Sequence, residues 1–130
     1  MSKRAIVCVD DEAIILLSLK QELKTCFGDS FLYETATSGL EALDIVESLK
    51  EDGIEAVLII SDWLMPGLNG DEFLQLVSSR YDKVAAIMIT GHADETAIHK
   101  LEADPSVLAV LRKPWNPKTL RSIVANYSDT

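Results

Sequence analysis

Charged and hydroxyl side chains lie within the first few positions after four of the apolar runs in this sequence. They are Asp10, Asp11, Glu12, Asp62, Thr90 and Lys113. Carboxylates that gather in one place repel each other, and one of them would normally keep a proton. A hard divalent cation removes this conflict, and Mg²⁺ suits a site with few carboxylates and several waters. An ammonium group and a hydroxyl beside such a site can hold phosphoryl oxygens. The set therefore predicts phosphoryl transfer to a carboxylate.

Each of these residues also has an ordinary structural explanation. Asp10 or Asp11 could cap a helix, and Asp62 could be a turn aspartate before a Pro-Gly pair. Thr90 could simply end a strand, and Lys113 is by default a surface lysine. Taken singly, these explanations are favoured. Taken together, the residues all fall at the carboxyl ends of expected strands, and none of the strand starts carries a comparable set.

Apolar patterns predict five strands that alternate with five helices. Short, nearly continuous apolar runs are typical of strands buried on both faces. The expected strands are residues 5–9, 31–37, 54–60, 84–89 and 107–111. Apolar residues at helical spacing, with capping and stop residues beside them, predict the helices. The expected helices are residues 12–27, 38–53, 73–81, 94–103 and 116–127. Residues 62–70, rich in Pro, Gly and Asn, are expected to form a loop.

This strict alternation predicts an α/β fold. Strands covered on both faces and joined by right-handed crossovers form an open, doubly wound parallel sheet. We expect a flavodoxin-like (βα)5 architecture with a five-stranded sheet of order 2-1-3-4-5, because five strands are too few for an eight-stranded barrel. In that order the first and third strands are neighbours at the switch point, where ligands bind outside the carboxyl ends.

Length and composition exclude several other classes of protein. The 130 residues fit one domain, residues 1–130, and the mix of 48% hydrophobic and 25% charged residues is globular. A net charge of −9 disfavours direct binding to nucleic acid and to anionic lipid. No apolar run approaches the ~20 residues of a membrane helix. The two cysteines have no metal-binding spacing, so a reduced, cytoplasmic setting is expected.

As a set, the motifs of this chain resemble those of response-regulator receiver domains of bacterial two-component signalling, including the chemotaxis regulators. The resemblance covers about residues 4–127, which would be the core of a single receiver domain. It is carried by Val9-Asp10-Asp11-Glu12, by the segment Asp62-Trp63-Leu64-Met65-Pro66-Gly67-Leu68-Asn69-Gly70, by Thr90-Gly91 and by Lys113-Pro114.

The resemblance implies a phosphorylation site and a metal site. Asp62 would accept a phosphoryl group from a sensor histidine kinase or a histidine phosphotransfer protein. Asp11, Asp62 and the backbone carbonyl of Leu64 would bind Mg²⁺, for which Mn²⁺ can substitute. Asp10 would act through a water molecule on the metal. No other cofactor is implied.

The resemblance further implies how phosphorylation is detected. Thr90 and Lys113 would bind phosphoryl oxygens, and the peptide bond before Pro114 would be cis, which a proline permits. The chain would then be a switch that controls an output domain or partner. It would not be an enzyme beyond its own phosphorylation and dephosphorylation. Phosphorylation-dependent homodimerisation is a further expectation.

Two positions depart from the commonest pattern of these domains. Trp63 stands where a small or aliphatic residue is usual, and Val110 stands where an aromatic switch residue is frequent. We therefore expect the phosphorylation chemistry to be intact and the familiar coupling of a rotating ring to Thr90 to be altered. Trp63 could report on the adjacent Asp62, or it could simply pack in the core.

Other functions on the same fold fit less well. A flavin carrier would have a hydroxyl-rich loop after the first strand, where this chain has three acidic residues. An aspartyl-phosphate phosphatase of the haloacid-dehalogenase type would have a second aspartate at the position of Leu64. A receiver-like module that only binds partners is the third alternative, although the complete set of acids, Thr90 and Lys113 argues against it.

Overall fold

The computed structural model describes residues 3–63, 65, 67–81, 84–91 and 95–128. Its strands are β1 (Arg4–Val9), β2 (Leu32–Ala36), β3 (Glu55–Asp62), β4 (Ala85–Thr90) and β5 (Val107–Arg112). Its helices are α1 (Ala13–Phe27), α2 (Gly39–Glu51), α3 (Gly70–Arg80), α4 (Glu95–Glu102) and α5 (Pro117–Ser128), with a short 3₁₀ turn, η1 (Gly28–Ser30). All strand pairs are parallel, and their order is β2-β1-β3-β4-β5. The expected flavodoxin-like architecture is confirmed.

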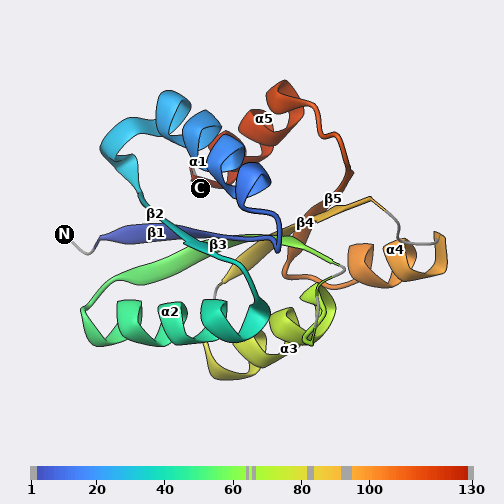
Figure 1. Ribbon diagram of the computed structural model, residues 1–130, viewed down its shortest axis with the longest axis horizontal. Helices are drawn as coiled ribbons and strands as arrows, with labels where there is room; N and C mark the ends of the chain where they lie inside the picture. Colours follow the sequence, from blue (N-terminus) through green and yellow to red (C-terminus); the bar gives the residue numbers. More distant parts are fainter. Residues whose placement is uncertain (1–2, 64, 66, 82–83, 92–94, 129–130) are drawn as a thin grey trace.

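The sheet lies between two layers of helices (Figure 1). Helices α1 and α5 cover one face, and α2, α3 and α4 lie on the other. Successive strand residues point to opposite faces, so the two halves of the core alternate along each strand. On β3, Ile60 packs with Leu19 of α1 and Leu120 of α5, whereas Ile59 packs with Val46 of α2 and Phe73 of α3. This two-sided burial explains why the strands are apolar throughout.

Side-chain caps set the points at which three helices begin. The Ser38 hydroxyl accepts a hydrogen bond from the backbone N–H of Glu41 at 3.1 Å, before α2. Asn69 and Glu72 form a reciprocal capping box before α3. The Asn116 side chain accepts from the N–H of Lys118 at 2.9 Å, before α5. Such caps satisfy backbone donors that a helix leaves free at its first turn.

The structure corrects the expected extent of the loop at residues 62–70. Strand β3 was expected to end at Ile60, but it continues through Ser61 and Asp62, whose backbones pair with Met88 and Ile89 of β4. Strand β4 likewise continues to Thr90. Polar side chains at these positions interrupt an apolar pattern without interrupting the backbone hydrogen bonds. The loop also ends earlier than expected, because the cap at Asn69 starts α3 at Gly70.

Among the described residues, no helix has both the length and the apolar character needed to cross a membrane.

Candidate functional site

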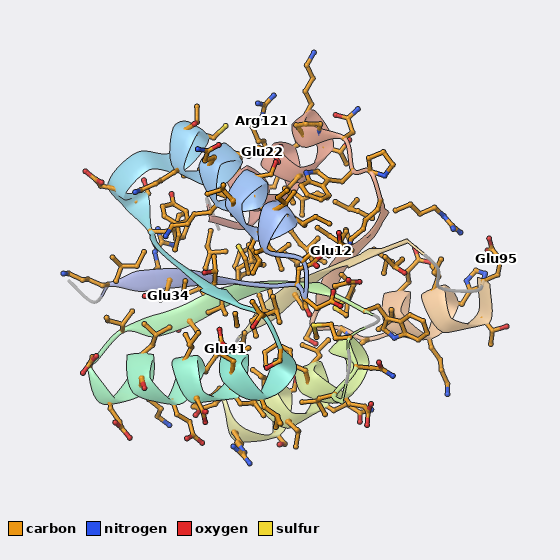
Figure 2. All side chains as sticks on the ribbon, viewed as in Figure 1. Glu12, Glu22, Glu34, Glu41, Glu95 and Arg121 are labelled. Carbon is orange, nitrogen blue, oxygen red and sulfur yellow. The ribbon has the colours of Figure 1, made fainter. Side chains whose placement is uncertain are left out.

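The expected site residues lie at one edge of the sheet. Asp10 directly follows β1, Asp62 is the last residue of β3, and these two strands are neighbours. Thr90 ends β4, and Lys113 directly follows β5. Because all the strands are parallel, their carboxyl ends meet at this edge. Glu12, labelled in Figure 2, marks the point where the chain passes from β1 into α1.

Lys113 joins the two buried carboxylates of the site. Its Nζ lies 2.9 Å from Oδ2 of Asp10 and 3.0 Å from Oδ2 of Asp62. The side chains of Asp10 and Asp62 are only 4% and 8% exposed, and that of Lys113 is 18% exposed. Burial by itself lowers the pKa of Lys113, but the hydrogen bonds and charges of the two aspartates outweigh burial and raise it. Lys113 is therefore a fixed positive charge at neutral pH.

Asp10 makes a second contact with its other carboxylate oxygen. Oδ1 accepts a hydrogen bond from the backbone N–H of Glu12 at 2.8 Å. The N-cap of α1 is Glu12, and no side chain caps this helix. Asp10 therefore holds the turn before α1 with one oxygen and binds Lys113 with the other. Burial raises the pKa of Asp10, while the Glu12 N–H and the Lys113 ammonium oppose that rise. The carboxylate of Glu12 is exposed and does not belong to the cluster.

The three aspartates have a geometry that fits a divalent cation. Oxygens of Asp10, Asp11 and Asp62 all lie within 4.8 Å of one another, with Asp11 exposed to solvent. Three carboxylates and the Lys113 ammonium leave a formal charge of −2, which a divalent cation would neutralise. Carboxylate and water oxygens are the ligands that Mg²⁺ prefers. The expected fourth contributor, the backbone carbonyl of Leu64, lies outside the described residues.

Thr90 is buried beside the lysine. It is 1% exposed, and its backbone carbonyl accepts a hydrogen bond from the Lys113 N–H at 2.8 Å. The end of β4 therefore holds the backbone of Lys113 in place. The peptide bond between Lys113 and Pro114 is cis.

Trp63 and Val110, the two departures from the common pattern, lie in one hydrophobic cluster. Both side chains are partly buried and pack against residues of α3, β4, α4 and β5. The buried members of that cluster are Leu74, Ala86, Met88, Leu101 and Val107. Trp63 therefore has a packing function as well as its position next to Asp62.

One contact near the site was not expected from the sequence. The indole Nε1 of Trp115 donates a hydrogen bond to Oε2 of Glu22 at 3.2 Å, joining the segment after β5 to α1. The two residues are 93 positions apart, so no local pattern could have indicated the pair.

Comparison with known proteins decides the family. Residues 6–125 match the family model of the response regulator receiver domain. The chain belongs to this family. Receiver domains of two-component systems are phosphorylatable switches, are not generally classed as enzymes, and bind Mg²⁺ at an acidic pocket.

Individual relatives agree with this membership. The chain is 28% identical over 119 residues to Sensor kinase CckA of Brucella abortus, covering 92% of this chain and 12% of that protein. It is 31% identical over 115 residues to the Positive alginate biosynthesis regulatory protein of Pseudomonas aeruginosa, covering 88% of this chain and 43% of that protein. It is 25% identical over 127 residues to Sporulation initiation phosphotransferase F of Bacillus subtilis, covering 98% of this chain and 95% of that protein. The receiver domain spans 12% to 43% of the length of the first four curated relatives.

Solved structures are similar over nearly the whole receiver domain. A response regulator receiver domain protein from Clostridium thermocellum has a TM-score of 0.80 at 28% identity, covering 97% of this chain and 94% of that one. Chemotaxis response regulator CheY4 of Vibrio cholerae has a TM-score of 0.74 at 27% identity, covering 97% and 99%.

Proposed function

We propose that this receiver domain accepts a phosphoryl group on Asp62 from a phosphohistidine of a sensor histidine kinase or a histidine phosphotransfer protein. The observation that carries the proposal is the position of Lys113, whose ammonium lies between the buried carboxylates of Asp10 and Asp62. Asp11 completes a three-carboxylate cluster at the solvent side of this pair.

The geometry supports a simple transfer step. A carboxylate oxygen of Asp62 attacks the phosphorus atom, the phosphorus–nitrogen bond of the donor breaks, and the departing imidazole keeps the electron pair and takes a proton. Lys113 is already at 3.0 Å from Asp62 and can turn its ammonium to an incoming phosphoryl oxygen. The Thr90 side chain, at the end of the neighbouring strand, would bind another oxygen.

Asp11 and Asp62 would hold Mg²⁺ or Mn²⁺ directly, Asp10 would hold it through a water molecule, and the backbone carbonyl of Leu64 would be a further ligand. A bound cation would supply the positive charge that lets an anionic phosphoryl donor approach a cluster of carboxylates. Asp10 itself keeps Lys113 in place and is held by the Glu12 N–H.

The comparisons support the partners that we propose. Two relatives are named as a sensor kinase and as a phosphotransferase, which agrees with a phosphohistidine donor. The acidic charge of −9 agrees with protein partners rather than direct nucleic-acid binding or membrane attachment. We further propose that residues 1–130 form one cytoplasmic receiver domain, and that phosphorylation controls an output domain, a partner or a homodimer.

The test is phosphorylation by acetyl phosphate with Mg²⁺, measured by intact mass and peptide mapping. The parent should gain one phosphoryl group, labile to hydroxylamine, and Asp62→Asn should gain none. Asp44→Asn is the matched control, because Asp44 is an exposed aspartate on α2. Chelation by EDTA should abolish the reaction. Undiminished labelling of Asp62→Asn, or a parent that never gains the group, would contradict the proposal.

A further inference from the structure

We propose that Glu22 is a positioning residue for the phosphoryl-transfer site, and that it acts on Lys113 through Trp115. This inference rests on the proposed function, because it assigns the position of Lys113 to a contact outside the acidic cluster. Glu22 lies in α1 and touches neither the aspartates nor Thr90 in any hydrogen bond described for it.

The contact joins α1 to the connection between β5 and α5. Trp115 Nε1 donates to Glu22 Oε2 at 3.2 Å, and the Trp115 ring packs partly buried on the core cluster beneath α1 and α5. Figure 1 shows α1 and α5 lying together on one face of the sheet, and Figure 2 labels Glu22 in that region. The ring is thus held by packing, and the hydrogen bond fixes its orientation against α1.

Trp115 is close enough along the chain to restrain Lys113. Only Pro114 separates the two residues, and the ring of a proline restricts the backbone angle φ. On the other side, the N–H of Lys113 is bound to the Thr90 carbonyl at 2.8 Å. Lys113 therefore lies between two anchors, one on β4 and one on α1. The second anchor limits how the lysine moves when a phosphoryl group replaces its contact with Asp62.

The carboxylate of Glu22 uses only one of its two oxygens in the described hydrogen bonds. Oε1 is buried and has no hydrogen-bond partner among the described residues. Buried polar atoms without partners are uncommon and cost stability. Glu22 is therefore held by one described hydrogen bond, the one from Trp115. It gives the indole N–H a charged acceptor, and charge-assisted hydrogen bonds are stronger than neutral ones.

The decisive measurement is the rate of phosphorylation by acetyl phosphate with saturating Mg²⁺ in a set of full-length variants. Glu22→Leu removes the acceptor, and Trp115→Phe removes the donor while keeping an aromatic ring. Each should slow the reaction by about threefold to tenfold, less than the full strength of a hydrogen bond to a charged group, because the contact acts on Lys113 only through the backbone. The double variant should be no slower than the slower single variant, since both remove the same contact.

Glu22→Gln provides rescue, because an amide oxygen still accepts from the indole. It should react faster than Glu22→Leu and within about threefold of the parent, because the hydrogen bond is kept but weakened when a charged acceptor becomes a neutral one. The control for an unrelated surface contact is Arg80→Ala, which breaks the exposed 3.0 Å ion pair between Arg80 and Glu47. It should leave the rate unchanged.

A second readout separates this inference from the proposed function. In unphosphorylated protein, the backbone amide signal of Lys113 in a ¹H–¹⁵N spectrum should shift in Glu22→Leu, shift less in Glu22→Gln and stay in place in Arg80→Ala, since all three variants keep the Trp115 ring. If the parent is never phosphorylated but these shifts occur, the proposed function fails and the coupling of Glu22 to Lys113 is supported. If the parent is phosphorylated, and folded Glu22→Leu matches its rate with Lys113 unmoved, the inference is overturned. Should Glu22→Leu fail to fold, the phosphorylation rates decide the question: a folded Trp115→Phe that matches the parent overturns the inference, and a slowed Trp115→Phe beside a rescued Glu22→Gln supports it.

Discussion

Replacing Lys113 with alanine tests the electrostatics of the site most directly. The substitution leaves two carboxylates, 4% and 8% exposed, without the ammonium that lies 2.9 and 3.0 Å from them. Removing one partner of a buried ion pair commonly costs about 3–5 kcal/mol. Lys113 is 18% exposed and Asp11 opens the cluster to solvent, so without metal we expect the free energy of unfolding to fall by about 2–3 kcal/mol, below the range for a fully buried pair.

The loss should depend on pH in a defined direction. The pKa of Lys113 is raised above 10.5 in the folded protein, so its stabilising contribution is complete below that pH and is lost as pH rises through the higher folded value. The difference between parent and Lys113→Ala should therefore shrink in strong alkali. It should also shrink in acid, where protonated carboxylates no longer need a counter-charge.

The same substitution should strengthen Mg²⁺ binding. The Lys113 ammonium competes with a dication for the same carboxylates and repels it, so we expect at least roughly tenfold tighter Mg²⁺ binding in the variant. Phosphorylation should nevertheless slow, because the positive charge that we propose for binding the phosphoryl group is gone. Urea unfolding in EDTA measures the loss of stability, and calorimetric titration with Mg²⁺ measures the change in metal affinity.

Lys118→Ala is the matched control, since it removes the same charge from an exposed position on α5. It should leave both the free energy of unfolding and the affinity for Mg²⁺ nearly unchanged. If Lys113→Ala were as stable as the parent at pH 7 in EDTA, or bound Mg²⁺ more weakly, the electrostatic account of the site would be refuted.

Three further predictions concern single groups. Burial raises the pKa of the Cys8 thiol to about 12, so at pH 8 iodoacetamide should label exposed Cys26 and spare Cys8 until urea unfolds the chain; native labelling of both would contradict this. The raised pKa of buried Asp10 means that its contribution to stability is complete below pH 3.8 and is lost as pH rises through the folded value. Because Lys113 keeps its contact with Asp62, Asp10→Asn should therefore destabilise the protein less than Lys113→Ala does at pH 7 in EDTA, and a larger loss in Asp10→Asn would refute this. Mg²⁺ and then beryllofluoride should change the tryptophan emission, and Trp63→Phe should remove most of the response. If neither addition changed the emission, Trp63 would pack in the core without reporting on the site.

Much of the architecture follows from local patterns in the sequence. Apolar runs and helical spacing predict five alternating strands and helices, because burial on one face or two leaves a periodic trace in the chain. The types of residue at the strand ends predict which chemistry the site can do. The caps at Ser38 and Asn116 are also readable, since a helix start needs a side-chain acceptor within a few residues.

Contacts between distant residues were decided by the tertiary structure. Lys113 reaches Asp10 and Asp62 across 103 and 51 positions, and Trp115 reaches Glu22 across 93. Such distances depend on strand order, register and side-chain packing, which are set by the sum of many weak contacts rather than by any one segment. The extension of β3 through Asp62 has the same origin, because the neighbouring strand β4 supplies the hydrogen bonds that keep polar residues in the sheet.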